Sequence, residues 1–166
     1  MMTSRQATTD DLPVVRDLLW EYLQWANEHA NREFQVNFDI ASMLQTDMDT
    51  IQKFLPPQGR LLLADDGSSV VGCACMHTIG PAIAELKRMY VRPNNRRQGI
   101  GHRLVQDMIE TLHANGYRSL RLDSARFMKD AHRLYHAMGF HEIEQDPESG
   151  IPEDIRKNWI YMERTL

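Results

Sequence analysis

The sequence predicts an α/β (α+β) domain built around one central sheet. Three observations predict it. Apolar residues recur at helical spacing in the first third of the chain, and short β-type runs divided by turn residues follow. Strand and helix patterns then alternate to the end. The chain has 166 residues, the length of one ordinary domain, so we expect a single domain over 1–166.

The first half of the chain gives the predicted elements in order. A short strand is expected at 3–7, a helix from the Thr8–Asp11 caps to about residue 30, and a weaker helix at about 39–54. RLLLADDGSSVVGCACMHT then predicts a hairpin, because two β-type runs flank a DG turn. AIAELKRMYV (82–91) alternates like a third strand, which Pro93 closes by forcing Arg92 out of helical geometry.

The second half predicts two helices and three strands. After RRQGIG, apolar residues from Ile100 to Leu112 mark an amphipathic helix, which Asn115-Gly116 ends. SLRLD (119–123) is expected to be a strand, and AHRLYHAM a short helix stopped by Gly139. The segments 140–143 and 160–162 are expected to be the closing strands.

Composition excludes several classes of function. The formal net charge is −4, so general electrostatics predict no nucleic-acid partner. No apolar run approaches the ~20 residues that span a membrane, and MMTSRQATTDD does not resemble a signal peptide. Cys73 and Cys75 are too close on an extended chain to pair easily, and free thiols suit a reducing cytoplasm. We therefore expect a cytoplasmic protein that needs no membrane.

The turn RRQGIG (96–101) has an unusual composition for a helix start. Glycine and adjacent positive charges are both unfavourable there, unless an anion binds to the free N–H groups of the first turn. Gly99 and Gly101 would let that anion approach the backbone, and Arg96 and Arg97 would contribute charge-assisted hydrogen bonds. The turn lacks the Gly-Lys-Ser/Thr of a Walker loop and the Rossmann fingerprint. The alternative is a tight turn whose arginines face solvent.

AELKRMYVRPNNRRQGIGHRLV, followed by GYRSLRLD and AHRLYHAMGF, resembles the GNAT superfamily of acyl-CoA-dependent N-acetyltransferases over roughly residues 82–143. The resemblance implies a mixed, mainly antiparallel sheet with a splayed strand pair that holds acyl-CoA. It implies transfer of an acetyl group from acetyl-CoA to a primary amine of a small molecule or peptide, in a ternary complex and without a metal. A homodimer is compatible with it. The alternative is an acyl-CoA sensor or interaction domain without turnover.

The resemblance also implies roles for single residues. Tyr135 would protonate the departing thiolate, and Met128 stands where many members have an asparagine that contacts pantetheine. A backbone amide of the strand before the turn would polarise the thioester carbonyl. The implied cofactor-binding residues are Met89, Tyr90 and Val91, which would pair with pantetheine, and Arg96, Arg97, Gln98, Gly99, Ile100, Gly101 and His102, which surround the pyrophosphate.

The attacking amine must lose a proton, and a carboxylate is a suitable acceptor. Glu85 is the candidate base, because it lies on the strand that faces the expected thioester. The alternative for Glu85 is an ion pair with Lys87 or an arginine on the solvent side of the sheet. For Tyr135, the alternative is a core residue on an amphipathic helix.

Other groups have simpler interpretations. Cys73, Cys75 and His77 share a strand face, and we expect core packing rather than a metal site, which would need four ligands. His132 and His136 are expected on the surface. The acidic segment 144–154 is a solvated loop or a rim that attracts cationic amines. Tyr22 and Trp25 suit the packed face of the first helix, whereas Trp20 falls outside it and could line an acceptor cleft or a dimer contact.

Overall fold

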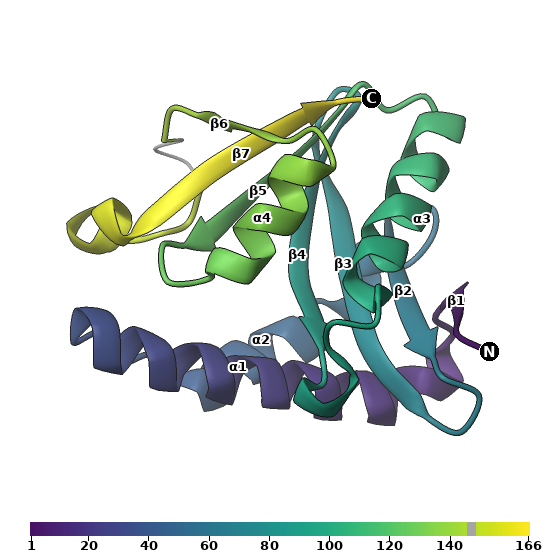
Figure 1. The fold of residues 1–166 in the computed structure, drawn as a ribbon, viewed down its shortest axis with the longest axis horizontal. Helices are drawn as coiled ribbons and strands as arrows, with labels where there is room; N and C mark the ends of the chain where they lie inside the picture. The colour runs from purple at the N-terminus through teal and green to yellow at the C-terminus, as the bar shows by residue number, and fades with distance from the viewer. Residues whose placement is uncertain (146–148) are drawn as a thin grey trace.

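The computed structural model describes residues 1–145 and 149–166, and the seven strands in that part of the chain form one sheet in the order β1-β2-β3-β4-β5-β7-β6 (Figure 1). The strands are β1 (Thr3–Gln6), β2 (Gly59–Asp65), β3 (Val70–Gly80), β4 (Ile83–Val91), β5 (Ser119–Ala125), β6 (His141–Ile143) and β7 (Trp159–Thr165). The helices are α1 (Leu12–Phe34), α2 (Ile40–Asp49), α3 (Ile100–Ala114) and α4 (Lys129–Ala137), with 3-10 turns η1 (Thr9–Asp11), η2 (Ile51–Phe54), η3 (Pro93–Asn95) and η4 (Glu153–Asn158). The predicted α/β class and order of elements are confirmed.

Two predicted helices have different bounds in the structure. The first extends to Phe34, beyond the expected end near residue 30, and Gln35 closes it in the left-handed conformation with φ 55°. Phe34 is held there by its contacts with the rings of Phe127 and Trp159. The stretch at 39–54 divides at Thr50, whose hydroxyl donates to the Thr46 carbonyl and competes with the helix.

β4 and β5 are the pair of strands that positions the site. They run parallel and pair only where Ile83–Glu85 meets Ser119–Arg121. The other neighbouring strands are antiparallel, and β4 stays paired with β3 up to Val91 while β5 stays paired with β7. Beyond Glu85, the backbone groups of β4 that face β5 therefore have no strand partner. The predicted splayed pair is confirmed.

A bulge bends β4 where the two strands separate. Cys73 pairs with Tyr90 and Cys75 with Lys87, so Arg88 and Met89 stand opposite a single residue of β3. Arg88 has φ 48°, which is uncommon outside glycine. Bulges redirect side chains and interrupt regular pairing, and this one lies in the part of β4 that no longer pairs with β5.

The helices cover the two faces of the sheet. Alternate residues of β2 and β3, among them Leu62 and Met76, pack beneath α3, and α4 lies on the same face of the sheet in front of β5 (Figure 1). The intervening residues, among them Leu63, pack against α1 and α2 on the opposite face. Cys73 and Cys75 belong to this second core and are fully buried free thiols, so the expectation of core packing is confirmed. In the part of the chain that the structure describes, no helix has the length and apolar character needed to cross a bilayer.

Candidate active site

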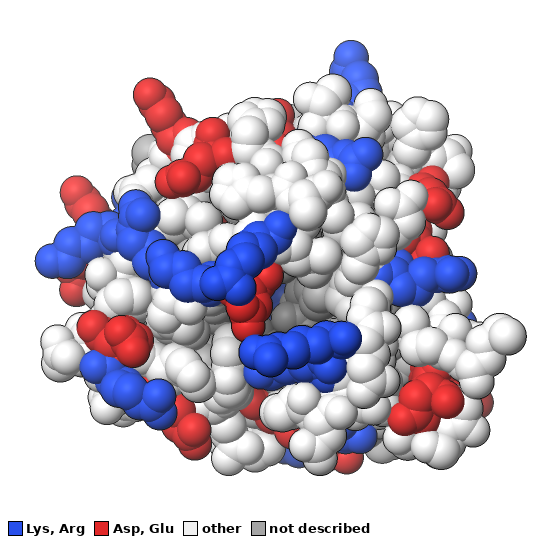
Figure 2. Space-filling view, viewed as in Figure 1, with Lys and Arg blue, Asp and Glu red and all other residues white. Residues whose placement is uncertain are grey.

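A cavity of about 1050 Å³ opens where β4 and β5 separate. Its walls come from α1, the separated parts of β4 and β5, the turn before α3, and α4. Figure 2 shows Lys and Arg side chains on both sides of the hollow between α4 and α1. Most of the residues that the sequence assigned to a site line this one cavity, namely Met89, Tyr90, Val91, Arg96, Arg97, Gly99, Ile100, Gly101, His102 and Tyr135. Two assigned residues, Gln98 and Glu85, are not among the described residues that line it.

The turn before α3 presents free backbone N–H groups to the cavity. Gly99 is the N-cap in the left-handed conformation with φ 78°, and a Cβ there would meet nothing within 4 Å. A Cβ on Gly101 would come within 3.0 Å of the Met89 side chain and 3.3 Å of Leu134. The first N–H groups of a helix have no partner within the helix and, with its dipole, attract anions. The turn therefore has the geometry of an anion site, and both glycines are explained.

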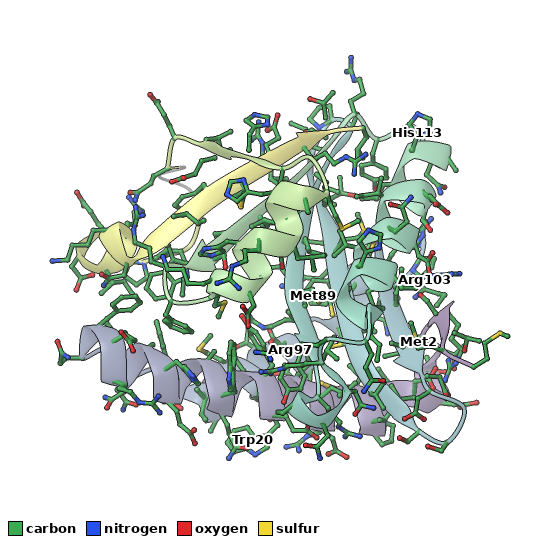
Figure 3. All side chains as sticks on the ribbon, in the orientation of Figure 1. Met2, Trp20, Met89, Arg97, Arg103 and His113 are labelled. Carbon is green, nitrogen blue, oxygen red and sulfur yellow. The ribbon has the colours of Figure 1, made fainter. Side chains whose placement is uncertain are left out.

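The two arginines of the turn have different surroundings. Arg97 is exposed, has φ 61°, and is labelled in Figure 3 between α1 and the turn. Arg96 is half-buried, and its Nε donates to the Val91 carbonyl over 2.8 Å. Its guanidinium lies 5.1 Å from the ring centre of Trp25 and 5.6 Å from that of Tyr90. Arg96 thus faces α1, whereas Arg97 stays at the surface of the turn.

Tyr135 projects from α4 into the cavity. The residue is 6% exposed, and its ring packs 5.5 Å from that of Phe140. Burial raises the pKa of Tyr135 above its ordinary value, and the nearby Tyr22 and Asp123 raise it further. The phenol therefore keeps its proton at neutral pH and can donate it.

Glu85 belongs to a chain of charged groups that ends in the cavity. Its Oε1 lies 3.1 Å from His77 Nε2 and 3.2 Å from Lys87 Nζ, and Lys87 Nζ lies 3.4 Å from Asp123 Oδ2. Lys87 and Asp123 line the cavity. Glu85 sits in the part of β4 that is still paired with β5, whereas Asp123 sits on β5 where the strands have separated. The structure therefore gives Glu85 the ion pair with Lys87 that was its alternative.

Asp123 is a cavity carboxylate that sequence reasoning missed. Burial raises its pKa, the charge of Lys87 partly opposes this shift, and the charge of Glu85 adds to it. Burial acts in the same direction on Glu85, but the hydrogen bond from His77 and the charge of Lys87 outweigh it, so the pKa of Glu85 is lowered. The surroundings therefore make Asp123 more basic than an ordinary aspartate and Glu85 less basic than an ordinary glutamate. Only the position of Asp123, directly after the apolar part of SLRLD, could have indicated it.

Aromatic residues of α1 form the wall opposite β4, which we call the aromatic wall: Tyr22, Trp25 and His29 from α1, with Phe127 from the loop after β5. The ring centres of Trp25 and Phe127 are 6.0 Å apart, and those of His29 and Phe127 5.4 Å. All four residues line the cavity. The sequence assigned Tyr22 and Trp25 only to packing. Trp20 does not line the cavity; it packs partly buried against the core under α1 and is labelled below that helix in Figure 3.

Met128 lies at the start of α4 and lines the cavity. Its sulfur is 3.5 Å from the hydroxyl of Ser124, which donates to it. A thioether is a weak acceptor and has no N–H to offer. The position is therefore occupied by a group that cannot make an amide's hydrogen bonds.

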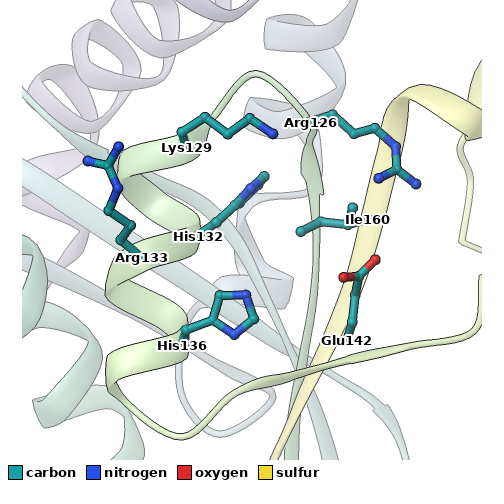
Figure 4. Close-up of a pocket in the computed structure, with 7 residues that line it drawn as sticks. All are labelled: Arg126, Lys129, His132, Arg133, His136, Glu142 and Ile160. Carbon is teal, nitrogen blue, oxygen red and sulfur yellow. The ribbon is translucent and has the colours of Figure 1, made fainter.

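A second, smaller hollow of about 350 Å³ lies beside α4 and is drawn in Figure 4. The residues that line it are Arg126, Lys129, His132, Arg133, His136, Glu142 and Ile160. The prediction that His132 lies on the surface is wrong: it is 8% exposed, and its Nε2 is 3.0 Å from the Ser124 hydroxyl. Burial lowers its pKa, as do the charges of Lys129 and His136. Among the described residues, no group of three potential metal ligands comes together.

The acidic segment 144–154 is described only in part, because residues 146–148 lie outside the described residues. Glu144, Glu153 and Asp154 are exposed, as a solvated loop requires. The two acids at 146 and 148 fall in the undescribed stretch, so the proposed acidic rim stays a prediction.

Comparisons with known proteins agree with this geometry. A model of the family described as "Acetyltransferase (GNAT) family" matches residues 13–140. The chain is 32% identical over 154 residues to an uncharacterized N-acetyltransferase of Schizosaccharomyces pombe, which covers 92% of this chain and 86% of the yeast protein.

Solved structures show the same fold. A GNAT-family acetyltransferase from Staphylococcus aureus has a TM-score of 0.76 at 21% identity, covering 100% of this chain and 99% of that one. The PaiA N-acetyltransferase from Thermoplasma acidophilum, solved in complex with coenzyme A, has a TM-score of 0.76 at 19% identity and the same coverage. Because the family model spans most of the chain and the sheet has the expected splay, the chain belongs to the GNAT acetyltransferase family.

Proposed function

We propose that the protein is an N-acetyltransferase that moves an acetyl group from acetyl-CoA to a primary amine of a small molecule or peptide, with both substrates bound at once. One observation carries the proposal: the unpaired edge of β4, the free N–H groups before α3 and Tyr135 all border a single cavity. Each of these three groups suits one part of the donor.

The residues that would hold the donor fit its chemistry. The backbone from Arg97 to His102 would bind the pyrophosphate, because its N–H groups are free and Gly99 and Gly101 leave room. The edge of β4 at Met89–Val91 would pair with the amides of pantetheine. The donor supplies an acyl thioester, which is the group that the amine attacks.

The protein would contribute proximity and two proton transfers. Holding the amine against the thioester makes the reaction effectively unimolecular. As the N–C bond forms and the C–S bond breaks, the carboxylate of Asp123 would take the proton that the amine loses, and the Tyr135 hydroxyl would give a proton to the sulfur. Glu85 would support this step through Lys87, or accept the proton itself as the sequence predicted.

The bulge in β4 would stabilise the charge that develops on the carbonyl oxygen. Arg88 and Met89 have left the regular ladder, so a backbone N–H there is free to point into the cavity. A preorganised N–H in a site that excludes water is worth more than it is in solvent. The bulge thus links a local irregularity of the fold to the reaction.

A second candidate function is an acyl-CoA sensor without turnover. It is favoured by Met128, which cannot make the hydrogen bonds of the expected asparagine. This protein would bind acetyl-CoA through the same turn but release no thiol when amines are added.

One experiment separates the two functions. Calorimetry first measures acetyl-CoA binding to the purified protein, and a thiol-release assay then follows turnover with a panel of primary amines. Binding with amine-dependent thiol release supports the enzyme, and binding without release on any amine supports the sensor. A folded protein that does not bind acetyl-CoA would contradict both.

A further inference from the structure

The part of the cavity beside α1 is chemically unlike the part beside α3. Tyr22, Trp25, His29 and Phe127 line it, and their rings form a continuous series of contacts. Large flat surfaces of this kind bind apolar or aromatic groups of a ligand. The ligand group that fits here is therefore apolar or aromatic rather than a charged chain.

Arg96 is a cation beside the aromatic wall, as is Arg88, which lies 5.9 Å from the ring centre of Tyr22. The Nε of Arg96 is occupied by the Val91 carbonyl, and its guanidinium stacks near the rings of Trp25 and Tyr90. Stacking engages the faces of a guanidinium and leaves the remaining N–H donors at its edge free for a planar anion. Among residues 1–145 and 149–166, no carboxylate forms an ion pair with Arg96.

Two arginines near Arg96 in the sequence, Arg88 and Arg92, are already neutralised. Arg88 donates from Nε and Nη2 to the two carboxylate oxygens of Asp47, at 2.7 and 3.2 Å. Arg92 makes the equivalent contacts with Glu21. Of these three arginines, Arg96 is the one that pairs with no carboxylate of the described chain, and it lines the cavity. Arg97 also lines the cavity without a described carboxylate partner, but it is exposed on the turn, whereas Arg96 lies against Trp25.

Beyond Arg96, the same cavity holds Asp123, which contacts Lys87 through Oδ2 and whose carboxylate has further lone pairs that can accept hydrogen bonds from an amine. A ligand that satisfies both groups has an amine near Asp123, an anion near Arg96 and an apolar body against the aromatic wall. A polyamine would instead place further positive charge beside Arg96.

On the basis of the proposed function, we propose that the acceptor is an amine that also carries a carboxylate and an apolar or aromatic body, an amino carboxylate, and that Arg96 binds the carboxylate. Arg96 is then a determinant of acceptor specificity. This differs from the pyrophosphate role that the sequence suggests for Arg96, and the two roles affect different substrates.

The test compares amines in matched pairs. The panel contains aromatic and aliphatic amino acids with α-, β- or γ-amino groups, each measured against the amine that lacks the carboxylate, together with spermidine. Wild type should prefer the carboxylate member of the best pair by roughly 10- to 100-fold in kcat/KM, the effect of a charge-assisted bond. Preference for spermidine or for the decarboxylated amines would overturn the proposal.

The variant Arg96→Gln locates the effect. It should abolish the preference within the best pair, while the KM of acetyl-CoA changes less than threefold. The control variant is Arg103→Gln. It removes the same charge from an exposed arginine that pairs with Asp107, and it should leave the preference for the carboxylate member intact. If Arg96→Gln instead raises the KM of acetyl-CoA and leaves the preference unchanged, Arg96 serves the pyrophosphate and the proposal is wrong.

A binding measurement separates this proposal from the proposed function. Each pair is titrated by calorimetry into protein saturated with coenzyme A, which requires no turnover. Tighter binding of the carboxylate member, lost in Arg96→Gln, supports the proposal even if the protein is a sensor. Equal binding of both members contradicts it even if the protein acetylates amines.

Discussion

The two halves of the cavity, which we call the donor half and the acceptor half after the substrates they are proposed to bind, are built in different ways. The donor half uses backbone groups of one continuous segment, from β4 through the turn into α3, with Tyr135 following on α4. The acceptor half uses side chains from α1, β4, β5 and the loop after β5, fixed by pairs such as Asp47–Arg88 that are 41 residues apart in sequence. Backbone chemistry leaves local sequence signals, and assembled side chains do not. The difference explains why the sequence alone indicates the cofactor but not the acceptor.

The largest effect is expected at Asp123, where the two halves meet. Asp123→Asn should lower kcat by roughly 100- to 10,000-fold, the usual loss when a general base is removed. The affinity for acetyl-CoA should change little, because Asp123 is placed to contact the amine. Steady-state kinetics and calorimetry measure the two quantities, and a normal kcat would exclude Asp123 as the base.

Glu85→Gln is the matched variant and also tests the predicted role of Glu85. A base acts only when it is ionised, and burial and the charge of Glu85 both raise the pKa of Asp123. In wild type, the acid limb of the pH profile, where kcat/KM falls as the pH is lowered, should therefore lie at a higher pH than the pKa of an ordinary aspartate. Loss of the Glu85 charge lowers the pKa of Asp123, so the acid limb should move to lower pH. A loss in kcat equal to that of Asp123→Asn, with no shift of the limb, would make Glu85 the base.

The next effect concerns the stability of the acceptor half. Asp47→Asn should lower the free energy of unfolding by about 3 kcal/mol, because the partly buried Arg88 loses its partner. The control Asp107→Asn breaks the exposed ion pair with Arg103 on α3, and it should lower the free energy of unfolding by less than about 0.5 kcal/mol. Urea denaturation compares the variants, and equal losses would show that the long-range pair does not support this wall.

A smaller effect tests the turn. Gly99→Glu should weaken acetyl-CoA binding by roughly 10- to 100-fold, because it adds negative charge where the pyrophosphate would bind. Gly116→Glu is the control: Gly116 has φ 80° and similarly open surroundings at the other end of α3. Both substitutions place a side chain on a left-handed backbone, so both should lower the free energy of unfolding by about 1–2 kcal/mol. Equal loss of binding in both would indicate unfolding rather than an anion site.

The smallest effect is expected at Tyr135. Tyr135→Phe should lower kcat roughly tenfold, less than the loss at Asp123, because a thiolate is a good leaving group and departs without full protonation. Acetyl-CoA affinity should be unchanged within a factor of about two. An unchanged kcat would assign Tyr135 to packing, which was its alternative interpretation.

The sequence predicts the fold well because hydrophobic periodicity and turn residues are local. The strands, α3 with its glycines, and α4 up to Gly139 follow from such patterns. The end of α1 was missed because it depends on the contact of Phe34 with Trp159, which lie far apart in the chain. His132 was misplaced for a similar reason, since its partner Ser124 belongs to β5.

In the site, contacts between charged residues that are distant in the chain are likewise difficult to predict from sequence. The place of Glu85 on a strand makes it a candidate base and also allows its ion pair with Lys87, two residues further on the same strand. Its contact with His77, by contrast, depends on the register between β3 and β4. Asp123 has no motif, and its importance arises only because β4 and β5 separate beside it. Residue type, position in an element and partners on the same strand can be predicted from sequence, whereas the partners on other strands that set a pKa cannot.

Two adjacent stripes of side chains on α1 have different roles. The buried stripe of Val15, Leu18, Leu19 and Leu23 anchors the helix to the sheet, and an adjacent stripe of Tyr22, Trp25 and His29 faces the cavity. Substitutions in the second stripe leave the first intact, so the cavity wall can change without loss of the anchor. The helix therefore separates folding from substrate choice, which would let related proteins diverge in their acceptors through few mutations while the remainder of the molecule stays constant.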